Sequence, residues 1–255
     1  HSRILYFPAG TYVISDTLWT KYPDGKPHFG MKMLGQSRSK VVIKLKDDCP
    51  GFQDPAKPKP MIIQCSRNAV SGNMAHWNNM INCTIDTGSG NPGAVALDYL
   101  ASNIGSTYNV LIRSGDGTGV CGLSMLRKWP GPCLIKNVKI VGFDHGIRVG
   151  GAEYGVTFEN IFLERQRVAG IGDSGNMLHI RKLHSRNVVP VFRDEAKRNH
   201  RRTQLTMLDC TFEGGSPATP ALVASGPTYL RNCKASGYAG VIRGCGNNVG
   251  EYIYP

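Results

Sequence analysis

The chain has 255 residues, a formal net charge of +12 and 31 glycines, while charged residues make up only 19% of it. This length suits one domain over residues 1–255 with a single core, and the glycine content suits many short strands joined by tight turns. There is no run of about 18 apolar residues, no recognisable nucleic-acid-binding module and no alternation of basic with aromatic residues. We therefore expect neither a membrane span nor a nucleic-acid partner.

The first 45 residues predict four short strands. The stretch 3–14, RILYFPAGTYVI, is typical of two strands joined by a Pro-Ala-Gly turn. Two further strands are expected at Met31–Gly35 and Val41–Leu45. The YFPAGTY motif, followed by a Leu-Gly-Gln step and a short apolar strand, resembles the opening of the pectate-lyase-like superfamily. Within it, the closest resemblance is to the group related to family 28 glycoside hydrolases.

This resemblance implies a right-handed β-helix that acts on or binds carbohydrate. It also implies a secreted, periplasmic or cell-surface protein, although this chain carries no signal peptide, and an N-terminal capping helix that is missing or lies outside the chain. The family 28 signatures Asn-Thr-Asp, Asp-Asp, Gly-His-Gly and Arg-Ile-Lys are not intact. Residues 144–146 (DHG) and 180–182 (IRK) match them only in part. No catalytic residue therefore follows from the resemblance.

Three stretches without periodicity are expected to be loops or turns. Residues 46–60 are rich in proline, and residues 66–79 are polar and contain His76 and Trp77. Residues 115–119, GDGTG, are glycine-rich, but neither a helix nor a Lys-Ser/Thr pair follows them. We therefore expect a β-turn there and not a phosphate-binding loop.

A short pattern recurs from residue 82 onward: an Asn, an apolar residue, a variable residue and a second apolar residue. Its copies end at residues 85, 112, 140, 163, 183, 212 and 235. The copy ending at 183 lacks the Asn, and the copy ending at 212 begins with Asp. The steps between copies range from 20 residues (163 to 183) to 29 residues (183 to 212). Repeats of this size are typical of solenoids.

A second short strand is expected after most copies of the pattern, at 94–97, 122–125, 146–149, 188–192, 221–223 and 240–242. No segment has a helical stripe long enough for the crossover of a βαβ unit, which disfavours leucine-rich and doubly wound folds. The sequence therefore predicts an all-β fold, a right-handed parallel β-helix of about seven coils preceded by an N-terminal strand region. We expect the recurring Asn side chains to stack as a ladder of hydrogen-bonded amides at an inner turn.

The repeat register selects candidate catalytic residues. If the last apolar residue of each copy points inward, the next one points outward, and this outward column contains Glu164, His184 and Glu213. Adjacent coils lie about 4.8 Å apart, so the two glutamates would be about 9.6 Å apart with His184 between them. That separation is near the upper end for the two carboxyl groups of an inverting glycosidase. Arg113, in the same column, is a candidate for substrate binding.

Three residues further along, a second column contains Asp116, Asp144 and Arg167. If the two aspartates are neighbours, one pKa would be raised, as a shared-proton acid/base pair requires. Arg167 and Arg148 are placed where they could grip a carboxylate or sulfate with two hydrogen bonds. The alternative is that all of these are ordinary exposed residues joined by lateral ion pairs.

Tryptophans and cysteines offer two further predictions. Trp77 and Trp129 are candidate sugar-stacking platforms, although large aromatic residues also pack inside solenoids. Cys83, Cys210 and Cys233 occupy a repeat position that Val or Ile fills elsewhere, so we expect them inside the stack. The eight cysteines show no metal-ligand spacing. We expect no metal and no cofactor.

Basic residues are concentrated in residues 181–202, which favours an acidic polysaccharide as the partner, and the alternative is ordinary solvated charge on a loop. We expect a carbohydrate-active enzyme that hydrolyses glycosidic bonds through the outward carboxylates, with elimination as the less favoured reaction. The alternative is a non-catalytic β-helix, either a glycan-binding module or a tailspike-like adhesin that forms trimers. A surface lined by acids and arginines would favour the enzyme, and a flat apolar flank would favour assembly.

Overall fold

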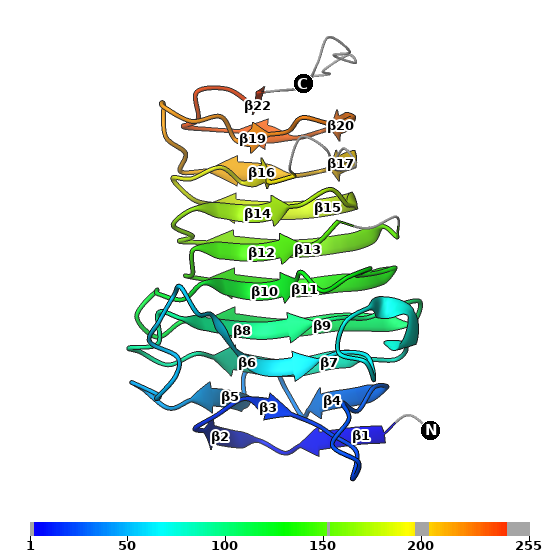
Figure 1. Cartoon of the computed structure of the whole chain (residues 1–255). Coiled ribbons are helices and arrows are strands. Elements are labelled where there is room, and N and C mark those ends of the chain that lie inside the picture. The colour runs from blue at the N-terminus through cyan, green and yellow to red at the C-terminus, as the bar shows by residue number, and fades with distance from the viewer. Residues whose placement is uncertain (1–2, 152–153, 197–203, 244–255) are drawn as a thin grey trace.

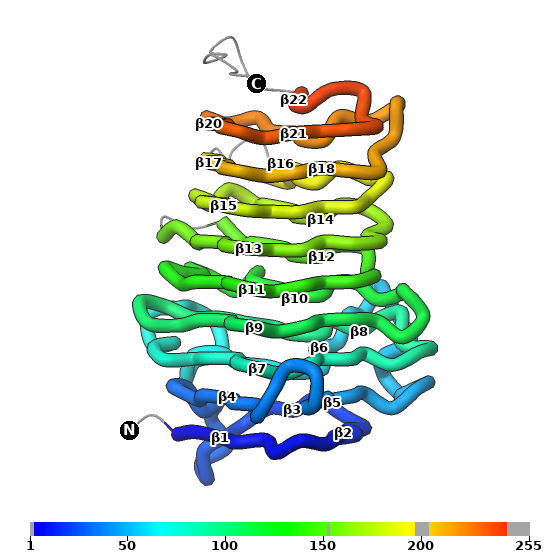
Figure 2. Tube along the Cα trace, turned by 180° about the vertical axis from the view of Figure 1, so that it is seen from behind, coloured from blue at the N-terminus to red at the C-terminus, as the bar shows by residue number. Residues whose placement is uncertain are grey.

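The computed structural model describes residues 3–151, 154–196 and 204–243. The chain winds into a right-handed parallel β-helix whose coils are stacked along one axis from the N-terminal to the C-terminal end (Figure 1). Two parallel sheets run the length of the stack, one of 13 strands, here sheet A, and one of 9 strands, here sheet B. Figure 2 shows sheet A from the side opposite to the view in Figure 1. The predicted fold class is confirmed.

Sheet A contains β1 (Arg3–Phe7), β2 (Gly10–Ile14), β4 (Met31–Gly35), β5 (Val41–Leu45), β7 (Asn79–Asp86), β9 (Gly105–Arg113), β11 (Cys133–Val141), β13 (Val156–Glu164), β15 (Met177–Arg186), β17 (Gln204–Leu208), β18 (Thr211–Glu213), β20 (Thr228–Arg231) and β21 (Lys234–Ala235). Sheet B contains β3 (Leu18–Trp19), β6 (Lys59–Gln64), β8 (Ala94–Tyr99), β10 (Cys121–Met125), β12 (His145–Val149), β14 (Ala169–Asp173), β16 (Phe192–Asp194), β19 (Leu222–Val223) and β22 (Ile242–Arg243). A single turn of 3₁₀ helix, η1 (Gly72–Met74), lies between β6 and β7. Within the described ranges, no helix is long and apolar enough to cross a membrane.

The recurring Asn marks a bend in sheet A. The residue at this position has a positive φ of 53–57° in seven coils: Asn82, Asn109, Asn137, Asn160, Lys182, Asp209 and Asn232. Asn tolerates this left-handed conformation better than most residues because its short amide can hydrogen-bond locally. The amides stack in pairs, since Asn109 donates to Asn82 over 2.8 Å and Asn160 donates to Asn137 over 2.8 Å. The predicted ladder is confirmed for these pairs, whose side chains are half-buried.

The core lies between the two sheets and is built from residues in register. On sheet A, Ile112, Ile140 and Leu163 pair along neighbouring strands, and all three are fully buried. On sheet B, Leu97, Leu123, Ile147 and Ile171 form the facing row. Cys83, Cys210 and Cys233 are buried as well, as predicted. Burial of each large aliphatic side chain contributes about 1.5–3 kcal/mol, so the stack of identical positions stabilises every coil against its neighbours.

One coil departs from the predicted register. Ile161 pairs with Leu183 and Leu163 pairs with Ser185, so this copy of the pattern ends at residue 185 and not at residue 183. Ser185 is fully buried and accepts a hydrogen bond from Asn187 over 2.9 Å. A serine therefore occupies a position that is apolar in neighbouring coils. This shift of two residues changes which side chains face outward beside Glu164.

Two glycines interrupt the alternating pattern of one strand, which the sequence therefore does not predict. β14 contains Gly170 and Gly172, and both are buried. A Cβ at Gly170 would lie 2.7 Å from the Val191 carbonyl oxygen, and one at Gly172 would lie 2.8 Å from the Glu195 carboxyl group. Glycine is required because the next coil packs so closely on this strand. The strand predicted at 188–192 is wrong except for its last residue, at which β16 begins.

Candidate functional site

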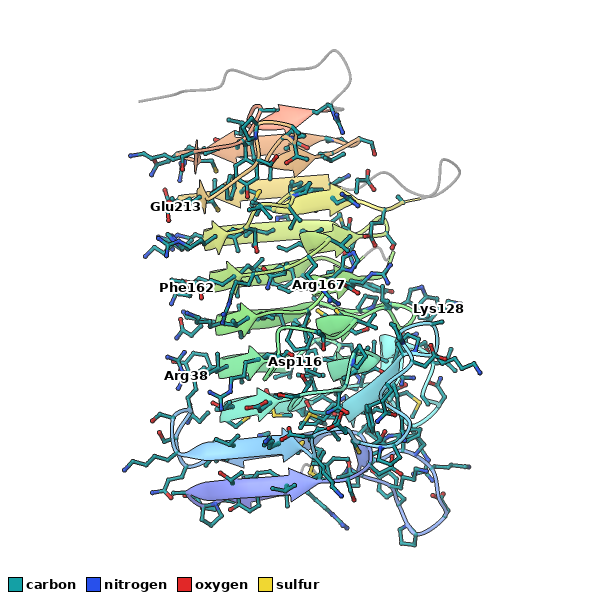
Figure 3. All side chains as sticks on the ribbon, turned by 90° about the vertical axis from the view of Figure 1, so that its left-hand side faces the viewer. Arg38, Asp116, Lys128, Phe162, Arg167 and Glu213 are labelled. Atoms are coloured by element: carbon teal, nitrogen blue, oxygen red, sulfur yellow. The ribbon has the colours of Figure 1, made fainter. Side chains whose placement is uncertain are left out.

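The structure distributes the predicted site residues over three surfaces (Figure 3). Glu164, His184, Glu213 and Arg113 lie on strands of sheet A, whereas Asp116, Asp144 and Arg167 lie in the turns that lead from sheet A to sheet B. Arg148 lies on sheet B, and Trp77 and Trp129 lie in loops that lead from sheet B back to sheet A. In Figure 3, Glu213 is on the left, Asp116 and Arg167 are in the middle, and Lys128, next to Trp129, is on the right. These residues do not form one site.

On sheet A, the row that contains the two predicted glutamates has an arginine between them. Glu164 pairs with Arg186, and Arg186 pairs with Glu213, along β13, β15 and β18. The prediction that His184 lies between the glutamates is wrong, because the register of β15 is shifted by two residues. His184 instead lies beside Phe162, with 5.9 Å between the ring centroids.

Cations lie beside both glutamates of this row. The Lys139 ammonium is 3.0 Å from a carboxylate oxygen of Glu164. Glu213 is 3.5 Å from His184 Nε2 and 3.8 Å from the Arg186 guanidinium. All of these side chains are about a third exposed or more, so the contacts of Lys139 and Arg186 are surface ion pairs. Glu164 and Glu213 are two coils apart in register, about 9.6 Å along the stack, and each carboxylate already has a cationic partner.

Arg113, a predicted substrate-binding residue, belongs to the same row at the end of β9. Its Nε donates a hydrogen bond to Asp86 on β7 over 2.7 Å, and Asp86 is buried. This contact is a lateral ion pair between neighbouring coils. It holds the guanidinium against the coil below.

The two predicted aspartates of the turns do not share a proton. Asp144 forms an ion pair with Arg167 at 2.9 Å. Burial alone would raise the pKa of Asp116, but hydrogen bonds from the Gly90 amide and from Thr118 outweigh burial and lower this pKa to about 2. The expected raised pKa is therefore wrong for Asp116, because hydrogen-bond donors surround it where a second carboxyl group was expected.

A cluster of charged side chains with little exposure lies on the outer face of sheet B. Asp98 on β8, Ser124 on β10 and Arg148 on β12 are in register, and their neighbours along each strand point into the core. The cluster, here the sheet B cluster, consists of Asp98, Arg127, His145, Arg148 and Glu195. Charged groups with restricted solvent access are where functional sites commonly occur.

Glu195 is held by two partners on β12. His145 Nε2 is 2.9 Å from Oε1 of Glu195, and an NH2 nitrogen of Arg148 is 2.8 Å from Oε2. The absence of a side chain at Gly172 makes room for the carboxyl group. Burial would raise the pKa of Glu195, but the hydrogen bond from His145 and the positive charge of Arg148 lower it to about 2. Glu195 is therefore ionised at every pH at which the protein is expected to work.

The pKa of Asp98 is shifted in the opposite direction. The guanidinium of Arg127 donates two hydrogen bonds to one carboxylate oxygen, over 3.0 Å and 2.6 Å. Burial raises the pKa of Asp98, and the interactions with Arg127 oppose this shift without cancelling it. Arg127 also donates to the carbonyl oxygen of Ala69, which fastens the loop before β7 to sheet B. Two carboxyl groups on one face thus have pKa values shifted in opposite directions.

Two more groups of this face are buried. His145 Nδ1 has no hydrogen-bond partner among the described residues. Cys121 pairs with His145 in register, and burial raises the pKa of its thiol to about 12. A buried thiol of this kind is not a nucleophile near neutral pH. Over residues 3–151, 154–196 and 204–243, no group of three or more His, Cys, Asp or Glu side chains could hold a metal ion.

The sequence analysis missed Asp98 and Glu195 as site residues. A signal for Asp98 was present, because it is the one charged residue in the otherwise apolar or aromatic strand AVALDY of β8. Glu195 had no such signal, since it lies in a charged segment just after β16. The basic residues predicted to attract a polyanion lie partly at 197–202, outside the described residues, whereas Arg186 and Arg193 are described.

Residues 1–188, which are well over half of the chain, match the family described as rhamnogalacturonase A/epimerase, pectate lyase-like. The chain belongs to this family. It is therefore a carbohydrate-active β-helix of the pectate-lyase-like superfamily, and the resemblance noted at its first strands is confirmed. No curated protein matches the chain.

Three solved structures are similar to this family member. The Agl-KA catalytic domain is 14% identical with a TM-score of 0.49, covering 94% of this chain and 51% of that one. The catalytic unit of the GH87 α-1,3-glucanase from Streptomyces thermodiastaticus strain HF3-3 is 11% identical with a TM-score of 0.46, covering 89% and 46%. The A-module of the mannuronan C-5 epimerase AlgE4 from Azotobacter vinelandii is 14% identical with a TM-score of 0.36, covering 95% and 89%. The chain spans about half the length of the first two.

Proposed function

We propose that the protein hydrolyses an acidic polysaccharide on the outer face of sheet B, with Asp98 as the proton donor and Glu195 as the base that activates water. The observation that carries this proposal is the opposite shift of their two pKa values, upward for Asp98 and downward for Glu195. A glycosidase needs one carboxyl group that keeps its proton and one that has lost it.

The register places the two carboxyl groups on one face but several coils apart. Asp98 is in register with Ser124, Arg148 and Gly172 on the three following coils, and the Glu195 carboxyl group lies over Gly172. Three coil steps correspond to about 14 Å along the stack, more than the roughly 6.5–9.5 Å between the carboxyl groups of an inverting glycosidase, in which the attacking water fits between the base and the sugar. The proposal therefore requires these side chains to move toward each other when a sugar binds. In this proposal Asp98 protonates the glycosidic oxygen, and Glu195 accepts a proton from that water.

The charge of the protein supports an acidic substrate. The chain has a formal net charge of +12, which attracts a polyanion, whereas Arg127 and Arg148 are paired with Asp98 and Glu195 inside the sheet B cluster. Arginine pairs with a carboxylate through two parallel hydrogen bonds, so either guanidinium binds an acidic sugar in this proposal by exchanging its present partner for the sugar carboxylate. The substrate class is therefore a polymer that contains uronic acids.

The experiment measures new reducing ends on a panel of acidic and neutral polysaccharides, with ultraviolet absorbance of unsaturated sugars as the readout for elimination. Asp98→Asn and Glu195→Gln should each lower the rate at least about a hundredfold, as expected when a catalytic acid or base is lost. Glu164→Gln and Glu213→Gln are matched controls on sheet A and should retain the activity of the parent. Loss of activity in the sheet A variants alone would show that the reaction takes place on sheet A and would refute the proposal.

A second candidate function is glycan binding without catalysis. The observation in its favour is that Asp98, Glu164, Glu195 and Glu213 all have cationic partners. If the protein binds polygalacturonate with a salt-sensitive affinity but produces neither reducing ends nor unsaturated sugars, this second function holds.

A further inference from the structure

Two tryptophans in the loops that lead from sheet B to sheet A have unusual backbone conformations. Trp77 and Trp129 each have a φ of 59°. Ala69 and Asn103, in the same group of loops, have φ values of 57° and 60°. A bulky side chain with a positive φ is unfavourable and persists only where the surrounding structure holds it, and such residues cluster at functional sites.

Hydrogen bonds fasten these loops to one another across the coils. The Gly72 amide donates to the Lys128 carbonyl over 2.9 Å, and the Lys128 amide donates to the Val70 carbonyl over 3.0 Å. A Cβ at Gly72 would collide with the Trp129 carbonyl oxygen, so the two segments are in close contact. Arg127 adds a further link through its hydrogen bond to Ala69. The backbone of both segments is therefore held in place before any ligand arrives, which reduces the entropy lost on binding.

Trp77 is exposed, Trp129 is half-buried, and positive charge lies beside the Trp129 ring. Trp77 is 42% exposed, and its ring lies 5.9 Å from that of His76. The Lys128 ammonium is exposed and lies 4.3 Å from the centre of the Trp129 ring. Figure 3 places Lys128 on the right, away from Phe162 and Glu213 of sheet A. An apolar ring with an adjacent cation matches a uronic acid, which has an apolar ring face and a carboxylate.

We propose that Trp77, Trp129 and Lys128 form an aromatic platform that binds uronate residues of an acidic glycan. A sugar ring stacks on the Trp129 indole, and the Lys128 ammonium leaves the ring face to pair with the sugar carboxylate. The inference rests on the proposed function for the substrate class, and it extends the binding surface from the sheet B cluster to these loops through Arg127. The competing occupant is a protein, since Val70 and Met74 are also exposed.

The test uses tryptophan fluorescence, because the chain contains only three tryptophans and two belong to the platform. The probes are an oligogalacturonate of defined length and the same oligosaccharide after reduction of its carboxyl groups. The variants are Trp77→Asn, Trp129→Asn and Lys128→Ala, since Asn tolerates a positive φ and leaves the backbone unstrained. Tyr229→Asn, at an exposed position on sheet A, is the matched control.

Each tryptophan substitution should weaken binding of the acidic probe about tenfold, equivalent to about 1.4 kcal/mol. Lys128→Ala should weaken binding of the acidic probe about fivefold and leave binding of the carboxyl-reduced probe unchanged. Tyr229→Asn should bind both probes as the parent does. The double variant of Trp77 and Trp129 retains only Trp19, so its affinity is measured by isothermal titration calorimetry and its fold is verified by circular dichroism. Unchanged affinity in this variant would overturn the inference.

Three outcomes show which of the two proposals, the platform or the hydrolysis, is supported. If Asp98→Asn abolishes turnover but still binds oligogalacturonate with a change in tryptophan fluorescence, both proposals stand. If the parent binds with such a change but never hydrolyses the polymer, the hydrolysis fails and the platform stands. If the parent self-associates in sedimentation experiments, and the tryptophan variants are monomeric while binding the glycan normally, the platform is a protein interface and the inference is overturned.

Discussion

Replacing Glu195 by Gln removes a charge from the sheet B cluster while the shape of the side chain is retained. Burial would raise the pKa of Glu195, but the hydrogen bond from His145 and the charge of Arg148 lower it from 4.5 to about 2. One pKa unit corresponds to about 1.36 kcal/mol, so the ionised carboxylate stabilises the fold by about 3 kcal/mol. The side chain is only 17% exposed, so solvent screening reduces this value little.

The pH dependence follows from the direction of the shift. The pKa of Glu195 is lower in the folded protein than in the unfolded chain, so its stabilisation is complete above a pH of about 4.5. This contribution is lost as the pH falls from about 4.5 to about 2. In urea unfolding followed by circular dichroism, Glu195→Gln should be about 3 kcal/mol less stable than the parent at neutral pH. The difference should become smaller at acidic pH.

Glu159→Gln is the matched control for this prediction. Glu159 pairs with Lys136 at 3.1 Å on sheet A, and both side chains are about a third exposed. Surface ion pairs contribute about 0–1 kcal/mol, so this substitution should change stability by less than about 1 kcal/mol. If Glu195→Gln unfolds at the same urea concentration as the parent, or if its deficit does not depend on pH, the electrostatic account of Glu195 is wrong.

Three further predictions test the coil and the surface. Ile140→Asp should not fold, because an unpaired carboxylate would be buried between two coils, and a cooperative melt by circular dichroism would contradict the inward register. Asn160→Ala should destabilise the protein by about 1–3 kcal/mol, through the lost bond to Asn137 and a strained positive φ. Asn160→Gly, which tolerates that φ, should recover part of the loss of melting temperature. Binding of polygalacturonate should weaken steeply as salt rises from about 0.1 M to about 1 M, where the Debye length falls from about 10 Å to about 3 Å.

The coil architecture could be predicted because the same residue types recur at positions with the same environment. Asn82, Asn109, Asn137 and Asn160 mark bends with a positive φ, a conformation in which Asn is favoured over most other residues. The residues that follow each Asn alternate in direction, with the apolar residues pointing inward and the variable residues pointing outward, as a half-buried strand requires. Backbone preference and core burial thus point to one structure in these coils.

The remaining coils could not be predicted because their residues carry weak or contrary signals. Gly170 and Gly172 remove the alternating pattern from β14, since close packing of the next coil leaves no room for side chains. Ser185 is a buried polar residue whose hydrogen bond to Asn187 makes its position acceptable, and the sequence alone does not reveal that bond. Lys182 replaces Asn at the bend of the same coil, so both markers of the register are absent from one copy.

An error in the register of one coil has large consequences for a site on a β-helix, because each site residue comes from a different coil. A shift of two residues in β15 exchanges His184 for Arg186 between Glu164 and Glu213, which changes an expected acid/base group into a permanent cation. The sheet B cluster depends on stacking in the same way, since Glu195 reaches the partners of β12 only across the coil that contains β14. In a solenoid, the distance between two candidate site residues can therefore be predicted only when the register of every coil between them is known. Here that condition identifies Asp98, the one charged residue of β8, and Glu195, which no local pattern marks, as the carboxyl groups to test first.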